Sequence, residues 1–348
     1  MQTGRVSPAL PDADLPWLGR AALFASGRDA LVALVRWGAE NRGWRRVWLP
    51  SYNCPEVPDA LLAAVGGAVE LRAYPDADLE APPNLVSVPV EAGDALVVVN
   101  QLGVRPPSDA GPARRRGAAV IEDHSHDPAS SWARESRADY AFASLRKTLP
   151  IPDGGAVWSP QGGRLPAEPE PGADAGARRA ARLAAGLETR HAPPAADGRL
   201  RFRALARAAA GSAEPTPGAA ISPVSRALLP QMPVRSWREG RRQNLETLAE
   251  AAAPASGLRV LVAAEGGVAF ALALVFDDAA ARSAAQRALT ARAVAPAVLW
   301  PLDPARDWGA GPADADLSSR ILLVHGDQRF GAEDMRRLAS ILRDTLRG

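Results

Sequence analysis

Lys147 is the residue of this chain best suited to covalent chemistry, because it is the only lysine among 348 residues. The other forty of the 41 Lys and Arg residues are arginines, and Arg146 shows that arginine is accepted at the adjacent position. A lysine shifts its pKa readily and can form an imine with an aldehyde, whereas an arginine stays protonated. The retained amine therefore indicates imine chemistry at position 147. The alternative is a surface lysine left by chance.

Carboxylates and imidazoles gather in a second segment, Val120–Asp127, which contains two histidines and three acidic residues. One interpretation is a metal ion shared by His124 and His126, but no other histidine lies in a supporting motif. The other interpretation uses the lysine. Asp123 ends an apolar segment, and Lys147 follows 24 residues later, after a strand predicted at 140–143. Neighbouring strands would bring the carboxylate and the amine into one site.

Alternating strand and helix patterns supply the frame for these residues. Apolar segments predict strands at 46–50, 68–74, 95–100 and 118–123, and a helix is predicted from about Glu56 to Val65. Continuous apolar strands separated by helices are typical of a parallel sheet covered on both faces. Ligands bind to such sheets at the carboxyl ends of the strands. The polar residues expected there are Tyr52, Asn100, Asp123 and His126.

A helix start lies ahead of these strands. The segment Leu23–Trp37 is predicted to be a loop that enters an amphipathic helix, and Ser26 is the candidate N-cap. The free backbone N–H groups at such a start can hold a phosphate, and Gly27 would allow its close approach. An ordinary N-cap with no ligand is the alternative interpretation.

The second half of the chain has a different pattern. Arg/Ala-rich helices are predicted at 178–188 and 201–210, and a long helix is predicted at Trp237–Ala252. Beyond them the sequence predicts an α+β unit, with strands at 258–262, 268–276, 297–301 and 320–325, helices at 278–291 and 333–346, and a long loop at 303–316.

Composition limits the class of protein. An apolar content of 47% is enough for a large globular core, and a net charge of +2 with mixed signs along the chain does not indicate a nucleic-acid partner. The single Cys54 excludes an internal disulfide and a cysteine-based metal site. The N-terminus lacks a signal-like pattern, and the longest apolar run, 268–276, is too short to span a bilayer. We expect a cytoplasmic protein without a membrane partner.

Five short motifs occur in an order that resembles the pyridoxal-phosphate (PLP) aminotransferases of fold type I, and in particular the DegT/DnrJ/EryC1/StrS family. They are Ser26–Leu31, Leu49–Tyr52, Ile121–His126, Ser144–Lys147 and Asp153–Gly155. The likeness is specific for about residues 20 to 160. It implies an α/β homodimer, with a large PLP-binding domain at 1–235 that carries a helical insertion at about 161–220. A smaller α+β domain would follow at 236–348.

The same resemblance implies a role for each motif residue. Lys147 would hold the cofactor aldehyde as an imine and move a proton, and Asp123 would keep the pyridine nitrogen protonated, since a cationic ring delocalises a carbanion better. His126 would bond the ring hydroxyl. The further cofactor contacts implied are ring packing by His124, an aromatic contact from Tyr52, and phosphate binding by Ser26, Gly27, Arg28 and Ser144.

The resemblance implies an aminotransferase that moves an amino group from an amino acid to a small keto or aldehyde acceptor, including a keto sugar or a biosynthetic intermediate. The Asn-aromatic-Arg stretch usual in the sugar enzymes is absent, so a nucleotide sugar is not indicated. Arg329 is a candidate for binding a substrate carboxylate, or else forms a local turn with Asp327. Lyase, decarboxylase or cyclase chemistry on the same Lys147 and Asp123 stays open, as does a non-catalytic scaffold.

Overall fold

A seven-stranded sheet forms the frame of the first half of the chain. The computed structural model describes residues 15–170 and 219–347. Its strands follow the order β1-β7-β6-β5-β4-β2-β3. They are β1 (Ala22–Phe24), β2 (Arg46–Pro50), β3 (Glu70–Tyr74), β4 (Asp94–Val99), β5 (Ala119–Asp123), β6 (Tyr140–Ser144) and β7 (Gly155–Trp158). The strands from β6 to β3 are parallel, and β7 is antiparallel to both of its neighbours. The predicted, mostly parallel sheet is confirmed.

Apolar side chains cover both faces of this sheet, because successive residues of a strand point to opposite sides. All six residues of β4 are buried. On one face, Leu31 and Leu34 of α1 (Gly27–Arg42) pack with the strands, beside α2 (Glu56–Val65). On the other face, Trp132 of α4 (Ser131–Glu135) and Ala113 of α3 (Gly111–Arg115) pack against Val120. The start of α1 and the carboxyl ends of β5 and β6 are thereby held in place.

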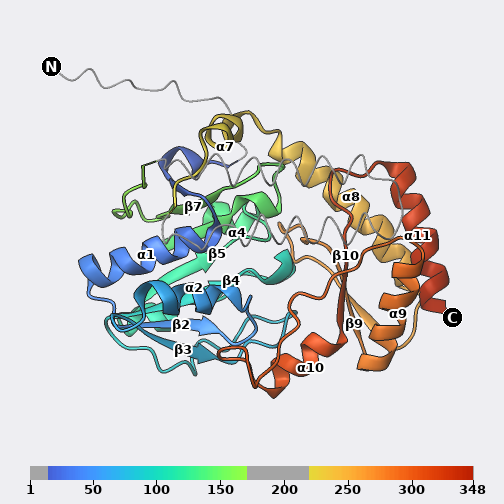
Figure 1. Cartoon of the computed structure of the whole chain (residues 1–348), viewed down its shortest axis with the longest axis horizontal. Coiled ribbons are helices and arrows are strands. Elements are labelled where there is room, and N and C mark those ends of the chain that lie inside the picture. Colours follow the sequence, from blue (N-terminus) through green and yellow to red (C-terminus); the bar gives the residue numbers. More distant parts are fainter. Residues whose placement is uncertain (1–14, 171–218, 348) are drawn as a thin grey trace.

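A three-stranded antiparallel sheet organises the second half, in the order β10-β9-β8. Its strands are β8 (Leu258–Leu261), β9 (Leu272–Phe276) and β10 (Ile321–Val324). The helices are α7 (Pro223–Leu228), α8 (Val234–Ala252), α9 (Ala279–Ala291), α10 (Pro312–Arg320) and α11 (Ala332–Arg347). Figure 1 shows α8 running from the first half of the molecule to the second, where it lies beside α11. The proposed domain boundary at residue 235 falls in the first turn of α8.

The two halves share one apolar core. Leu248 of α8 and Leu323 of β10 belong to the same buried cluster as Tyr52 and Leu102, which follow β2 and β4. The carboxyl-end edge of the large sheet is therefore in contact with the second half of the chain. Residues from both halves can contribute to a site at that edge.

Two predictions for the second half are wrong. Residues 297–301 form no strand but a single bridge between Ala297 and Leu323, because Pro296 and Pro301 cannot donate to a ladder. Strand β9 begins at Leu272 and not at Val268. The amide of Val268 donates to the Asp127 carboxylate and that of Phe270 donates to the Leu102 carbonyl, so this segment pairs with the first half of the molecule.

Four further segments differ from the sequence pattern or lie outside the described residues. The end of the predicted loop 303–316 is helical, because Pro312 suits a first helical position and Asp314 accepts the Gly311 amide. Strand β1 was not predicted, since three residues are too few to show a period. The helices predicted at 178–188 and 201–210 lie outside the described residues.

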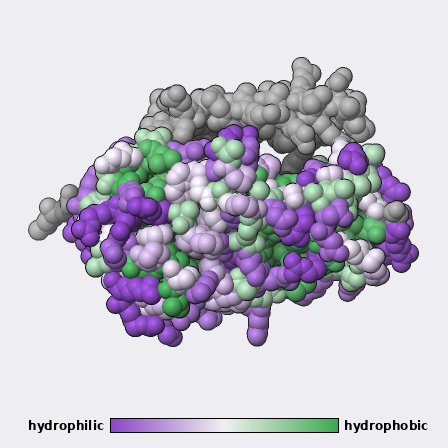
Figure 2. Space-filling view, turned by 90° about the horizontal axis from the view of Figure 1, so that it is seen from below, coloured by the Kyte–Doolittle hydropathy of each residue, from purple (hydrophilic) through white to green (hydrophobic). Residues whose placement is uncertain are grey.

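No helix in the described ranges combines the length and the apolar character needed to cross a bilayer. On the face of the molecule seen in Figure 2, apolar residues lie in separate groups among hydrophilic ones.

Candidate active site

Lys147 lies at the carboxyl end of the parallel strands. Strand β6 ends at Ser144, and one turn of 3-10 helix, Leu145–Lys147, follows it directly. The Lys147 Nζ atom lies 3.2 Å from His126 Nε2 and 6.0 Å from the centre of the Trp300 ring. Burial lowers the pKa of the Lys147 amine, and the nearby Asp123 carboxylate opposes this shift without cancelling it. The uncharged, nucleophilic form of the amine is thus more accessible than in a free lysine.

Asp123 and His124 face opposite sides of the sheet, as successive strand residues do. Asp123 closes β5, next to β6, and its Oδ1 accepts the Ser125 amide at 2.8 Å. The His124 ring is fully buried on the far side, with Nε2 3.0 Å from the Glu122 carboxylate and Trp132 and Trp158 around it. The structure brings Asp123 toward Lys147 but does not bring His124 there.

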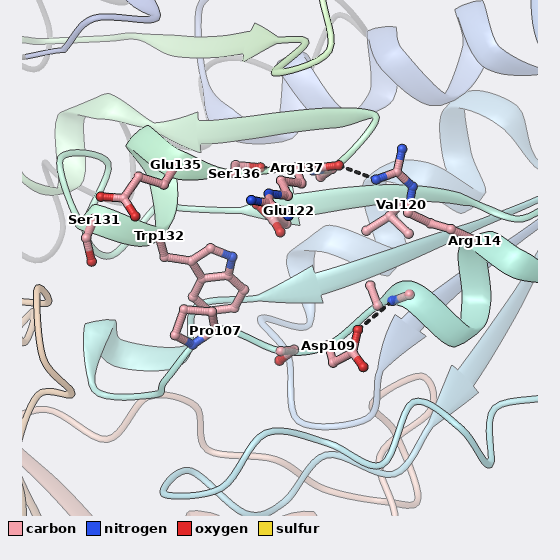
Figure 3. A pocket seen from close by; sticks show the side chains of 14 residues that line it. Pro107, Asp109, Arg114, Val120, Glu122, Ser131, Trp132, Glu135, Ser136 and Arg137 are labelled. Carbon is pink, nitrogen blue, oxygen red and sulfur yellow. Dashed lines mark hydrogen bonds between the residues drawn. The ribbon is translucent and has the colours of Figure 1, made fainter.

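A cavity of about 360 Å³ lies on the Glu122 side of the sheet. Figure 3 shows Glu122 and Val120 of β5 beside Trp132 and Glu135 of α4. Neither Asp123 nor Lys147 lines this cavity. It is separated by strand β5 from the lysine site.

His126 is the closest polar neighbour of the lysine. Its side chain is 2% exposed, and its Nδ1 accepts the backbone N–H of Leu102 at 3.1 Å. Burial holds the pKa of His126 well below the ordinary value, and a hydrogen bond with the Asn100 backbone opposes this shift without cancelling it. The rings of Phe270 and Trp300 lie 5.1 and 5.9 Å from its ring. His126 is therefore a neutral, aromatically enclosed group facing Lys147.

The start of α1 meets the Lys147 turn without intervening side chains. Ser26 caps α1 by accepting the Asp29 amide at 3.2 Å, which confirms the predicted N-cap. A Cβ on Gly27 would lie 2.8 Å from Ser144 Cβ, and one on Gly155 would lie 2.0 Å from the Ser26 carbonyl oxygen. Only glycine allows this contact. The N-terminus of α1 and Ser144 therefore lie against each other.

Arg28 follows Gly27 in α1, and Tyr52 lies in the loop after β2. Arg28 forms an ion pair with Glu56 at 2.7 Å, and both side chains are partly exposed. Tyr52 is fully buried, and its hydroxyl donates to the Leu299 carbonyl at 2.5 Å. Its ring lies 5.7 Å from Trp300. Tyr52 therefore joins the loop after β2 to the second half of the chain beside the lysine site.

Several groups near the lysine were not found by sequence reasoning. Arg241 of α8 and Gln328 after β10 both donate to the Thr148 carbonyl, at 3.2 and 3.0 Å. Phe270 packs on His126 from the segment before β9. Arg241 and Gln328 are 93 and 180 residues away from Thr148 in the sequence. No local pattern could have indicated them.

Arg329 lies in a local turn. Its Nε and Nη2 atoms donate to Asp327 at 2.7 and 2.6 Å, and its side chain is 67% exposed. This is the geometry expected of the local turn, the alternative to a substrate-binding role.

In the described part of the chain, no group of three or more His, Cys, Asp and Glu side chains is placed to hold a metal ion.

The whole fold is similar to that of solved aminotransferases. A DegT/DnrJ/EryC1/StrS aminotransferase from Brucella abortus matches 95% of this chain and 87% of its own, with a TM-score of 0.60 and 14% identity. DesI, solved with its TDP-sugar product, matches 94% of this chain and 81% of its own, with a TM-score of 0.62 and 20% identity. NtdA from Bacillus subtilis, solved with bound cofactor PMP, matches 95% of this chain and 74% of its own, with a TM-score of 0.63 and 14% identity.

The chain has the fold of these aminotransferases. The fold type I architecture implied by the sequence motifs is thereby confirmed. By sequence, no protein-family model and no curated protein matches the chain. At identities of 14 to 20%, the likeness establishes the fold.

Proposed function

We propose that the protein is a PLP-dependent aminotransferase that transfers an amino group from an amino acid to a small keto or aldehyde acceptor, including a keto sugar. The observation that carries the proposal is the contact of Lys147 with His126 beyond the carboxyl ends of β5 and β6, where Asp123 closes β5. Burial lowers the pKa of the Lys147 amine, and the Asp123 carboxylate opposes this shift. An amine with a lowered pKa suits imine chemistry.

The residues present fit the cofactor. Lys147 would hold the aldehyde carbon, Asp123 the pyridine nitrogen and His126 the ring hydroxyl. The phosphate would lie at the start of α1, where Gly27 keeps the space beside Ser144 open and backbone N–H groups are free to donate. The other residues proposed at this end are Ser26 and Arg28, and Tyr52 would approach the ring.

When bound, the cofactor supplies an electron-withdrawing ring that delocalises the electron pair left on the substrate carbon. The Lys147 amine would take the proton from the α-carbon of the donor and hold it for return. The Asp123 carboxylate would keep the pyridine nitrogen protonated, because an adjacent negative charge favours the protonated form. The rings of Phe270 and Trp300, packed around His126, exclude water from this side of the lysine.

We also propose that the enzyme is a cytoplasmic homodimer. The DesI and NtdA likenesses support an amino-sugar or related acceptor, while the lack of an Asn-aromatic-Arg stretch argues against a nucleotide-linked one. His124 is left with a structural role, because its ring packs away from Lys147.

Half-reaction assays with purified protein and PLP test the proposal. A suitable amino acid should abolish the visible absorbance of the lysine-bound cofactor and release one equivalent of its keto acid. Release of ammonia or carbon dioxide instead would contradict amino transfer. Lys147→Ala should abolish the signal, whereas Arg146→Ala, which changes the adjacent basic residue, should keep it.

A further inference from the structure

The hydrogen bond that His126 accepts from Leu102 indicates where the ring carries its proton, and the Asn100 backbone, which favours a protonated ring, is the competing partner. A backbone N–H can only donate, so the His126 Nδ1 atom that receives it at 3.1 Å carries no hydrogen. An imidazolium and the Nδ1–H tautomer are both incompatible with this contact. The neutral ring must carry its hydrogen on Nε2.

That Nε2–H group faces the lysine. Nε2 and Lys147 Nζ lie 3.2 Å apart, within hydrogen-bond distance. An ammonium has three donors and no acceptor, so it cannot receive the Nε2 hydrogen, whereas a neutral amine has a lone pair that can. The titratable groups that act on the amine are Asp123 and Cys54, which favour the ammonium, and Arg146 and Arg28, which oppose it along with burial. Burial is the largest of these effects and has the same direction as the hydrogen bond.

Leu102 is held in an uncommon backbone conformation. Its φ angle is 54°, in the left-handed region that few residues other than glycine adopt. Its side chain is fully buried, and its carbonyl accepts the Phe270 amide at 2.7 Å. The next residue, Gly103, has no room for a Cβ, which would lie 2.6 Å from the Val268 carbonyl oxygen. Contacts from both halves of the molecule therefore aim the Leu102 N–H at His126.

We propose that Leu102 is a positioning residue that holds His126 as the Nε2–H tautomer, and that this donor keeps Lys147 as a free amine ready to attack an aldehyde. The amine lone pair bonds to the aldehyde carbon, and water leaves with the aldehyde oxygen and both amine hydrogens. No base is needed to deprotonate the nitrogen beforehand. The same Nε2–H then becomes available to the ring hydroxyl oxygen of the cofactor, a last step that rests on the function proposed above.

The composition of the chain makes the tautomer directly measurable. There are four histidines, so ¹⁵N-histidine labelling of the full chain without added cofactor gives four ring systems, and His126→Gln identifies the one of interest. Nε2 should carry the hydrogen at neutral pH, and Nδ1 should show a coupling across its hydrogen bond to the Leu102 amide nitrogen. A hydrogen on Nδ1 would overturn the proposal.

The single lysine gives an equally direct second readout. ¹³Cε-lysine labelling gives one side-chain signal, whose titration midpoint should lie below the roughly 10.4 of a free lysine. His126→Gln, whose amide can accept from Leu102 and donate to Lys147, should keep the low midpoint, as should the control His325→Gln. A midpoint at or above the free value would overturn the proposal. Neither readout needs PLP, so failure of the proposed function would appear separately, as absence of PLP binding with the tautomer intact.

Discussion

Gly27→Ala is the substitution whose effect follows most directly from the geometry of the site. The added Cβ would lie 2.8 Å from Ser144 Cβ and 3.1 Å from Ser144 Cα and N, below normal contact distances. Overpacking of this kind costs about 1–3 kcal/mol. Alanine in place of a helical glycine returns about 1 kcal/mol of helix propensity. We expect the free energy of unfolding to fall by roughly 0–2 kcal/mol, the difference of these two effects.

The loss of PLP affinity should be larger than the loss of stability. Moving Ser144 away from the start of α1 removes a hydrogen bond to a charged phosphate, worth about 1.5–3 kcal/mol, which corresponds to a roughly 10- to 100-fold higher Kd. Absorbance titration with PLP measures the affinity, and urea denaturation measures the stability.

The chain offers a matched control for this prediction. Gly240 lies inside α8, and a Cβ there would meet nothing within 4 Å. Gly240→Ala should raise the free energy of unfolding by up to about 1 kcal/mol and leave PLP affinity unchanged. If Gly27→Ala proves as stable as Gly240→Ala and binds PLP as tightly as the unmodified chain, the phosphate site has been assigned to the wrong place.

Three other substitutions test separate parts of the account. Asp123→Asn should still bind PLP but transfer amino groups on the order of a hundredfold more slowly, because the developing charge loses its electrostatic partner. An unchanged rate in a single-turnover assay would show that the partner of the pyridine nitrogen lies elsewhere. Burial raises the Asp76 pKa from 3.8 to about 6 despite its ion pair with Arg105. Protonation of Asp76 therefore contributes roughly 3 kcal/mol to the free energy of unfolding below pH 3.8, and this contribution is lost as pH rises through 6. The fall in the free energy of unfolding between pH 4 and 7 should disappear in Asp76→Asn, and an unaltered fall would refute the assignment. Arg329→Ala should cost less than about 1 kcal/mol of stability, because its ion pair is exposed, and should leave the donor KM unchanged; a large rise in KM would restore the carboxylate-binding role.

Much of the large sheet and its site could be predicted from sequence because the signals there are local. Apolar runs bounded by turn residues gave β2 and α2 with their observed ends, and the polar residues after β5 and before Lys147 followed from the rule for parallel strands. The N-cap at Ser26 also follows from a local preference. Lys147 was found for a different reason, since it is unique in composition.

The contacts that complete the site depend on packing between distant segments. Alternation along β5 should have separated His124 from Asp123, but a family motif names adjacent residues without regard to the face each occupies. The Arg241 and Gln328 hydrogen bonds to Thr148 link the second half of the chain to the lysine turn. The left-handed conformation of Leu102 is likewise imposed by tertiary contacts, because leucine has no local preference for it.

The ε-amine of Lys147 is the group expected to hold the cofactor. Borohydride reduction after addition of PLP, followed by digestion and mass spectrometry, tests this without ambiguity among side chains, since the chain has one lysine. A single reduced pyridoxyl phosphate adduct should appear on the peptide that contains Lys147 and should be lost when an amino donor is added before the reductant. An unlabelled Lys147 in protein that still transfers amino groups, or an adduct confined to the N-terminal amine, would contradict it.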